Sequence, residues 1–293
     1  MMIFITGATG HFGKKVIDHL LFRRTIPGTI SALVRDNGKA ADLESKGINV
    51  QPGDYENYAS LLKAFKGTDK LLLISGNDVV NRSRQQENVV NAAREAGIRH
   101  IFYTSFERND DTGKSPLGLL AESHLSTEKL IKDSGIAYTI FRNNLYMDFI
   151  PAVLGQNVLE KGIFYPAGEG KLASALRSEM AEAAANTLIG KGHENKEYHI
   201  SNTEGVTFTK IADILSQLTE KKINFTSPDK QIYIETLVKG GAPKEFAQVF
   251  AGFGELIRQG GLSPEKSDLE YLLQRKPVSV NEFLRSIYGS KKE

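Results

Sequence analysis

The sequence contains no cysteine, which excludes disulfide bonds, thiolate nucleophiles and cysteine metal ligands. Its charges nearly cancel, at a formal net charge of +2, so the composition indicates no polyanionic partner such as nucleic acid. No stretch approaches the roughly 18 consecutive apolar residues that a transmembrane helix needs. The apolar start MMIFI runs directly into a glycine turn, which indicates a buried strand rather than a signal peptide. We therefore expect a cytoplasmic protein that neither crosses a membrane nor binds nucleic acid.

Several catalytic signatures are also missing. There is no Gly-x-Ser-x-Gly sequence, which disfavours a serine hydrolase. The histidines lack metal-ligand spacing such as His-x-x-x-His, so no metal site is predicted. Lys14 and Lys15 follow Gly13, where a nucleotide triphosphatase would have Gly-Lys-Ser/Thr, and this disfavours NTP hydrolysis.

The first half of the chain alternates short apolar runs with amphipathic stretches at helical spacing. The runs are rich in Ile, Leu and Val, as in parallel strands covered on both faces. The predicted strands are 3–6, 30–34, 48–51, 70–74, 100–104 and 137–141. One predicted helix, 81–96, is followed by Gly97 as a stop signal. This alternation predicts an α/β fold with a doubly wound parallel sheet of Rossmann-like type.

The pattern changes near residue 150. Loops with Gly and Pro follow, and from residue 207 onward the sequence is mostly helical. The predicted elements are helices 178–189, 207–218, 232–238, 244–258 and 280–288 and a strand 197–200. We predict a nucleotide-binding domain at 1–150 and a smaller, mostly helical lobe at 151–293, with some segments returning to the first domain. The oligomeric state is not indicated.

The loop after the first strand, ITGATGHFGKK, has glycines three apart at Gly7, Gly10 and Gly13. Because it opens a helix, its backbone N–H groups and the positive helix end are suited to a pyrophosphate. Gly7 would permit the turn, Gly10 the approach of phosphate, and Gly13 the packing of helix on strand. The alternative is a tight turn without a ligand.

The end of the second strand distinguishes the two nicotinamide cofactors. An acidic residue there binds the ribose 2′-OH of NAD, whereas an arginine accommodates the 2′-phosphate of NADP. The sequence ISALVRDN places Arg35 first and Asp36 second. Arg35 favours NADPH over NADH, while Asp36 keeps an NAD preference open.

Several motifs together resemble the NmrA-like atypical short-chain dehydrogenases. They include TGATGHFG, LVRD, NVVNAAREAGIRHIFYTS, HLSTEK, RNNLY and GEGKLAS. Within that family the sequence resembles type-2 NADPH:quinone oxidoreductases and, next, triphenylmethane-dye reductases. The resemblance spans nearly the whole chain.

The resemblance implies a role for each matching segment. The glycine loop would wrap the pyrophosphate and Arg35 the 2′-phosphate. Segment 54–55 would lie near the adenine, 74–76 under the ribose, 142–146 beside the nicotinamide, and 168–174 would close over the cofactor and quinone. The cofactor-binding residues implied in this way are Thr6, Gly7, Ala8, Thr9, Gly10, His11, Phe12, Gly13, Arg35, Asp54, Tyr55, Ile74, Ser75, Gly76, Arg142, Asn143, Asn144, Leu145, Tyr146, Gly168, Glu169, Gly170, Lys171, Leu172, Ala173 and Ser174.

The nucleotide-binding half lacks the Tyr-x-x-x-Lys pair of ordinary short-chain dehydrogenases. At the expected helix that spacing holds His124 and Glu128, which lie on one helical face. His124 is a candidate proton donor oriented by Glu128; alternatively the pair only stabilises the helix. Tyr146 is a second candidate catalytic residue, or else a core aromatic.

A quinone accepts hydride readily, so placement of the nicotinamide can supply most of the acceleration without a strong acid. We therefore predict an NADPH-dependent oxidoreductase that reduces a small quinone-like acceptor by hydride transfer. The alternatives are a redox sensor that binds NADP(H) without turnover and a reductase of another conjugated acceptor such as a cationic dye.

Overall fold

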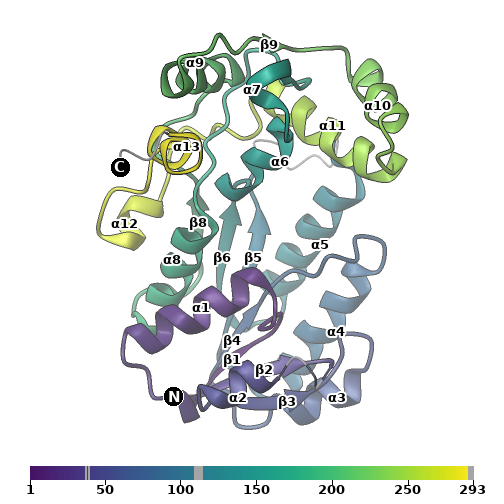
Figure 1. Cartoon of the computed structure of the whole chain (residues 1–293). Coiled ribbons are helices and arrows are strands. Elements are labelled where there is room, and N and C mark those ends of the chain that lie inside the picture. Colours follow the sequence, from purple (N-terminus) through teal and green to yellow (C-terminus); the bar gives the residue numbers. More distant parts are fainter. Residues whose placement is uncertain (37, 39, 109–114, 290–293) are drawn as a thin grey trace. The chain divides into compact units, whose positions relative to one another are not determined.

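The structure is a computed structural model that describes residues 1–36, 38, 40–108 and 115–289 (Figure 1). Its internal contacts divide the chain into two compact units. Unit 1 comprises Met1–Phe106, Leu119–Asn143 and Ser178–Tyr198, and unit 2 comprises Glu107–Gly118, Asn144–Arg177 and His199–Glu293. The chain thus passes between the units several times, and the predicted boundary near residue 150 lies inside a unit 2 segment.

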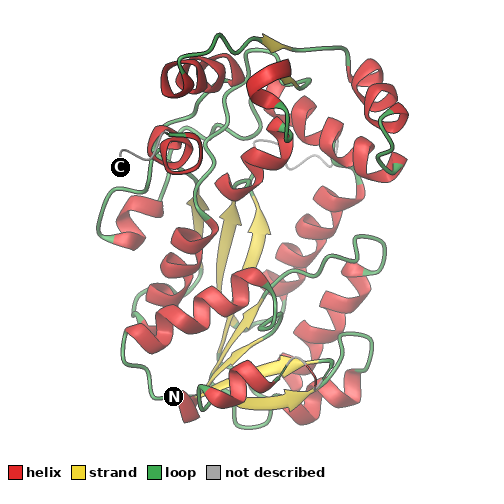
Figure 2. Cartoon of the chain, viewed as in Figure 1, coloured by secondary structure: helices red, strands yellow, loops and turns green. Residues whose placement is uncertain are grey.

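Unit 1 is built on a seven-stranded sheet, to which β8 adds the last strand (Figure 2). The strands are β1 (Ile3–Ile5), β2 (Ile30–Val34), β3 (Asn49–Pro52), β4 (Lys70–Leu73), β5 (His100–Phe106), β6 (Ala137–Asn143) and β8 (Lys196–Ile200). Their order is β3-β2-β1-β4-β5-β6-β8, and β1 to β6 pair in parallel. The order reverses at β1, between β2 and β4, and ligands bind at such a switch point in open α/β sheets. The predicted doubly wound fold is confirmed.

Helices cover both faces of this sheet (Figure 1). They are α1 (His11–Phe22), α2 (Ala41–Ser45), α3 (Tyr58–Ala64), α4 (Arg82–Glu95), α5 (Leu119–Asp133) and α8 (Arg177–Ile189), with a 3-10 turn, η1, at Pro27–Thr29. The apolar faces of α3, α4 and α5 pack against β1, β4 and β5 in one buried cluster. Phe4 and Phe65 belong to this cluster and form an edge-to-face pair with ring centroids 5.0 Å apart. Burial of these apolar faces holds the strand ends, and hence the loops after them, in place.

One strand departs from the predicted burial. The sequence indicates that 48–51 is covered on both faces, but β3 lies at the end of the strand order and its residues are exposed or half-buried. An end strand pairs on one side only, so its outer edge contacts solvent.

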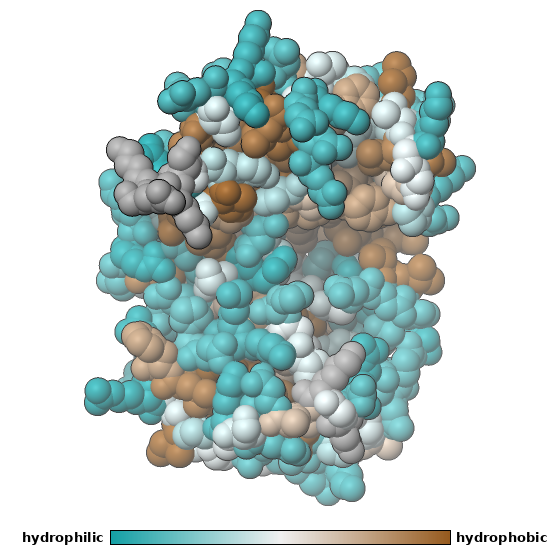
Figure 3. All heavy atoms as spheres, in the orientation of Figure 1, coloured by the Kyte–Doolittle hydropathy of each residue, from teal (hydrophilic) through white to brown (hydrophobic). Residues whose placement is uncertain are grey.

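Unit 2 is mostly helical around a short parallel pair of strands, β7 (Ile163–Phe164) and β9 (Phe225–Thr226). Its helices are η3 (Met147–Phe149), α6 (Ile150–Leu154), α7 (Val158–Lys161), α9 (Phe208–Thr219), α10 (Lys230–Lys239), α11 (Lys244–Arg258), α12 (Leu269–Leu273) and α13 (Val280–Tyr288). The exposed apolar side chains of α10 and α11 include Ile232, Phe246 and Val249. Figure 3 shows that hydrophobic residues reach the surface of this face in several places.

Across the described ranges, no helix is both long enough and apolar enough to cross a membrane.

The amino-terminal edge of the unit 1 sheet contains a buried histidine, His100. Thr139 Oγ1 donates to the carbonyl of His193, so His100 Nε2, 2.9 Å from Thr139 Oγ1, must be the donor in its own bond. Burial, reinforced by Lys70 and His193 and opposed by Glu194, lowers the pKa of His100 to about 4. The folded state therefore favours the neutral ring.

We expect this histidine to make the protein sensitive to acid. The unfolded state binds a proton near pH 6.5 and the folded state only near pH 4, so stability is full above about pH 6.5 and falls as the pH drops towards 4. The loss attributable to His100 should reach about 2–3 kcal/mol at pH 4. Urea unfolding at pH 7 and pH 4.5 should show a smaller loss for His100→Gln, which keeps an N–H donor but does not titrate. The exposed His11→Gln serves as the control, and equal losses in all three proteins would contradict the assignment.

Candidate active site

The glycine loop connects β1 to α1, and its three glycines have different constraints. Gly7 has a left-handed φ of +59°, which favours glycine. A Cβ on Gly13 would lie 2.4 Å from the carbonyl oxygen of Gly7, so α1 can approach the turn only if residue 13 has no side chain. A Cβ on Gly10 would contact only the Gly7 oxygen, at 3.2 Å, and Gly10 has an ordinary extended backbone. The fold therefore demands glycine at positions 7 and 13 but not at 10.

Thr6 anchors this loop at the switch point of the sheet. Its hydroxyl donates to the carbonyl of Leu72 and accepts from the backbone N–H of Ile74, so β1 and the end of β4 are held together. Tyr55, after β3, donates its hydroxyl proton to the carbonyl of Ile74 at 3.0 Å. The backbone N–H of Ser75 in turn donates to Thr104 Oγ1. Sequence-predicted residues from three strand ends, those of β1, β3 and β4, thus lie together at one edge of the unit 1 sheet, and Thr104 of β5, which was not predicted, joins them.

The ends of β2 and β3 form a pocket of about 300 Å³, which we call the Arg35 pocket. It is lined by Arg35, Pro52, Gly53, Asp54, Asn57, Ser60 and Lys63. Asp36, the residue that kept an NAD preference open, is not among them. Its Oδ1 instead accepts a hydrogen bond from the backbone N–H of Gly38 at 2.9 Å.

At the carboxyl end of β6, Arg142 and Asn143 have different surroundings. Arg142 Nη2 lies 3.0 Å from Glu128 Oε2 and 2.9 Å from Glu197 Oε2, so this arginine pairs with carboxylates of unit 1. Asn143 is 5% exposed, and its Nδ2 has no hydrogen-bond partner among the described residues. A buried amide without a partner costs stability unless something else accepts its protons. Asn143 therefore has an amide donor that no described residue uses.

Asn144, Leu145 and Tyr146 belong to unit 2. Both amide protons of Asn144 are used, because Nδ2 donates to Ser201 Oγ and to the carbonyl of Leu262. Asn144 Oδ1 accepts from the backbone N–H of Leu145 at 2.8 Å. These contacts make Asn144 a structural residue of unit 2, and its predicted contact with a nicotinamide has no support in this geometry.

Tyr146 lies under the guanidinium of Arg177, with 4.5 Å from Arg177 Cζ to the ring centroid. Burial raises the pKa of Tyr146 to about 12, although the charge of Arg177 opposes this shift. The phenol therefore keeps its proton at neutral pH and remains an O–H donor.

The segment 168–174 is held in place within unit 2. The backbone N–H of Gly168 donates to Ser227 Oγ, and Leu172 exchanges backbone hydrogen bonds with Val206. Ser174 is fully buried, and within the described residues its Oγ has no hydrogen-bond partner. Ser174 thus resembles Asn143 in having an unused polar atom at a position that the sequence assigns to cofactor binding.

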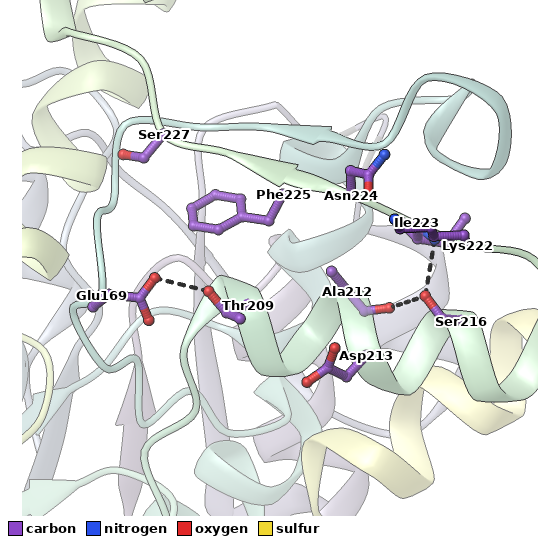
Figure 4. A pocket seen from close by; sticks show the side chains of 10 residues that line it. All are labelled: Glu169, Thr209, Ala212, Asp213, Ser216, Lys222, Ile223, Asn224, Phe225 and Ser227. Atoms are coloured by element: carbon purple, nitrogen blue, oxygen red, sulfur yellow. Dashed lines mark hydrogen bonds between the residues drawn. The ribbon is translucent and has the colours of Figure 1, made fainter.

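A larger basin of about 530 Å³ lies on the α9 side of unit 2 (Figure 4). Its polar lining is largely used internally. Thr209 donates to Glu169 Oε1, while Ser216 donates to the carbonyl of Ala212 and accepts from the N–H of Ile223 (Figure 4). Because these polar side chains already have partners within the protein, we assign the basin no ligand.

His124, the candidate proton donor, is buried within unit 1. Its Nε2 lies 3.2 Å from Arg82 Nη1, and because a guanidinium only donates, Nε2 must accept. The ring proton is therefore on Nδ1, which donates to the hydroxyl of Tyr103 at 2.7 Å. Tyr103 then donates to Gln86 Oε1 at 3.1 Å. In this network both ring nitrogens of His124 have partners inside the protein.

Glu128, four residues later, is part of a different network. Its Oε1 accepts from the hydroxyl of Ser105 and its Oε2 pairs with Arg142. The contacts of the two side chains thus point to separate partners, which favours the stabilising role over the proton-donating one.

Sequence reasoning missed the partners in these networks. Arg82, Gln86 and Tyr103 belong to elements that were predicted, but nothing in their local pattern indicates that they meet His124. Asn57 and Ser60 could have been found, because the sequence Asp54–Ser60 contains an N-cap signal, and Asn57 Oδ1 does accept from the N–H of Ser60. Lys63 lies one turn after Ser60 in α3, so its place beside these residues could also have been predicted from the helix.

Comparison with known proteins places this architecture in a family. The model of the NmrA-like family matches residues 1–284. Quinone oxidoreductase 2 of Escherichia coli (strain K12) is 37% identical over 290 residues, which are 98% of this chain and 99% of that protein. The structure of triphenylmethane reductase from Citrobacter sp. is similar with a TM-score of 0.90 at 37% identity, over 98% of this chain and 99% of that one. An NADPH-dependent quinone oxidoreductase from Escherichia coli, complexed with NADPH, gives a TM-score of 0.89 at 36% identity, over 98% and 100% of the two chains. With a family model that covers nearly all of its length, this chain belongs to the NmrA-like family.

Proposed function

We propose that this protein is an NADPH-dependent oxidoreductase that reduces quinones by direct transfer of a hydride. The observation that carries the proposal is the Arg35 pocket at the carboxyl ends of β2 and β3. Arg35 lines this pocket, whereas Asp36 does not line it and accepts a hydrogen bond from the N–H of Gly38. The similarity to an NADPH-dependent quinone oxidoreductase over nearly the full length of both chains supports it.

The residues of unit 1 fit such a cofactor. Gly10 leaves room for a pyrophosphate at the start of α1, where backbone N–H groups favour an anion. Arg35 would bind the 2′-phosphate in a charge-assisted pair. The unused amide of Asn143 would donate to the nicotinamide or to an oxygen of the acceptor. Tyr146 and Ser174 of unit 2 are proposed as further contacts.

NADPH, when bound, supplies two electrons and one proton as a hydride, and solvent supplies the second proton that converts a quinone to a hydroquinone. The chain's own contribution would then be positional. Backbone groups of the glycine loop and the Arg35 pocket hold the cofactor, and Asn143 orients the reacting end. Because a reduced quinone oxygen is only weakly basic, no side chain of this protein needs to act as a strong acid.

The test is the loss of NADPH absorbance with a panel of quinones, with NADH in parallel. We expect turnover with quinones and a preference for NADPH. A triphenylmethane dye belongs in the panel, because the similarity to triphenylmethane reductase favours a cationic dye as a second acceptor. Tight NADPH binding without turnover of any acceptor would instead indicate a redox sensor. A cytoplasmic location and the absence of a nucleic-acid partner stay predictions.

We expect His124→Ala to lower kcat with a quinone by less than about tenfold, whereas a positioned general acid is worth about 10²–10⁴-fold. The reason is that both ring nitrogens of His124 are bonded to Arg82 and Tyr103. The same change should cost about 1–3 kcal/mol of stability, because it leaves buried polar groups without their partner. His124→Gln, which keeps polar atoms there, should recover part of that loss. Stopped-flow kinetics with deuterium at the transferred position should still show a slowed chemical step. A thousandfold drop in kcat with cofactor affinity and fold intact would make His124 the proton donor.

A further inference from the structure

The Arg35 pocket contains a second cation that the family resemblance did not assign. Lys63 lies on the last turn of α3 and lines the same cavity as Arg35. Neither Arg35 nor Lys63 has an ion-pair partner among the residues that the structure describes. Many other cations of unit 1 do have one: Lys14, Lys46, Arg84, Arg99, Lys129 and Lys132 pair with carboxylates.

Lys63 determines whether the lining of the pocket has a net positive charge. Arg35 contributes one positive charge and Asp54 one negative charge, so these two alone sum to zero. Lys63 makes the lining net positive by one. A phosphate monoester carries a charge of about −1.5 to −2 at neutral pH, and a neutral lining would offer it little net attraction. Lys63 therefore makes the pocket more attractive to a dianion than Arg35 and Asp54 alone would.

The wall that carries Lys63 is held by local hydrogen bonds. Ser60 Oγ accepts from the backbone N–H of Asp54, and Asp54 Oδ1 accepts from the N–H of Glu56. Asn57 Oδ1 caps α3 by accepting from the N–H of Ser60. A Cβ on Gly53 would lie 2.7 Å from Leu33 Cδ1, so the loop packs directly on β2. These contacts place α3 and its lysine at a fixed position beside the end of β2.

We propose that Lys63 is a specificity-determining residue that binds the 2′-phosphate of NADPH together with Arg35. This inference rests on the proposed function, since it concerns the same cofactor. It extends that function by making discrimination between NADPH and NADH depend on two cations from different strand connections. The alternative role for Lys63 is stabilisation of the C-terminal end of α3, where a positive charge is favourable.

The probe is 2′,5′-ADP, which carries the adenosine end of NADPH with its 2′-phosphate, compared with 5′-AMP, which lacks that phosphate. Calorimetric titration of Lys63→Ala should show a Kd about fivefold higher for 2′,5′-ADP and NADPH, and unchanged within about twofold for 5′-AMP and NADH. Lys63→Arg should restore the affinity. Lys66→Ala is the matched control, because Lys66 is an exposed lysine of the same region that does not line the pocket. Its affinities should equal those of the unchanged protein.

Three outcomes would overturn the proposal. First, the Kd of Lys63→Ala for 2′,5′-ADP could equal that of the unchanged protein or that of Lys66→Ala. Lys63 would then have no role in binding. An equal loss for 2′,5′-ADP and 5′-AMP, accompanied by a lower melting temperature, would indicate the helix-stabilising role. In both cases the unchanged protein still prefers NADPH, so the proposed function survives. If the unchanged protein binds neither NADPH nor 2′,5′-ADP, both the proposed function and the role of Lys63 are wrong.

Discussion

Gly10→Val is expected to weaken NADPH binding by about a hundredfold or more in a protein that still folds. The second glycine of such a loop lets backbone approach the pyrophosphate, and an isopropyl group would occupy that space. The fold itself tolerates the change. Gly10 has φ −78° and ψ 167°, an extended conformation that valine adopts readily, and the nearest atom to a new Cβ is the Gly7 oxygen at 3.2 Å. Loss of glycine at the N-cap of α1 should cost only about 1 kcal/mol.

Fluorescence titration with NADPH and thermal unfolding together test this expectation. Gly28→Val is a suitable control. Gly28 lies in η1, directly before β2 and therefore at the opposite edge of the sheet from the glycine loop, and a Cβ there meets nothing within 4 Å. Gly13→Ala provides the contrast: its Cβ would lie 2.4 Å from the Gly7 oxygen and 2.7 Å from Ala8 Cα, so that variant should lose stability rather than affinity alone. Normal NADPH affinity in Gly10→Val would mean that the loop is only a structural turn.

Arg35→Ala is expected to raise the Kd of NADPH by about ten- to a hundredfold and to leave NADH nearly unchanged. A hydrogen bond to a charged group contributes about 1.5–3 kcal/mol, and each 1.4 kcal/mol corresponds to a factor of ten in affinity. NADH lacks the 2′-phosphate, so it has nothing to lose at this position. Arg35 lines the pocket and has no ion-pair partner among the described residues, so its removal leaves no buried carboxylate behind.

Competition binding with both cofactors measures this discrimination directly. Asp36→Asn is the informative companion, because Asp36 Oδ1 accepts from Gly38 N–H and an asparagine oxygen can do the same. We expect that variant to bind both cofactors like the unchanged protein. Equal weakening of NADPH and NADH binding by Arg35→Ala would show that Arg35 stabilises the loop and does not bind the 2′-phosphate. A gain in NADPH affinity from Asp36→Asn would show that the Asp36 carboxylate lies close enough to the 2′-phosphate to repel it.

Much of the secondary structure in both units could be read from local patterns. The bounds of β2 agree with the predicted 30–34, and α11 and α13 begin and end where their periodicity indicates. These elements follow from the sequence because period and capping are properties of neighbouring residues, as in the box formed by Ser279 and Glu282 at the start of α13. The position of Arg35 after the second strand follows in the same way, since it needs only the strand to end where it does.

The partners of buried polar groups could not be read in this way. Asn143 and Asn144 are adjacent and chemically identical, yet Asn144 is satisfied by Ser201 and Leu262 while the amide of Asn143 is not. His124 meets Arg82, 42 positions away in the chain, and Tyr103, 21 positions away. Whether a side chain is spent on structure or left for a ligand depends on which distant atoms packing brings within about 3 Å, and no local pattern encodes that distance. The sequence therefore determines the sheet, its switch point and the loop at Gly10, whereas the tertiary structure alone decides which of the polar residues around them remain available for chemistry.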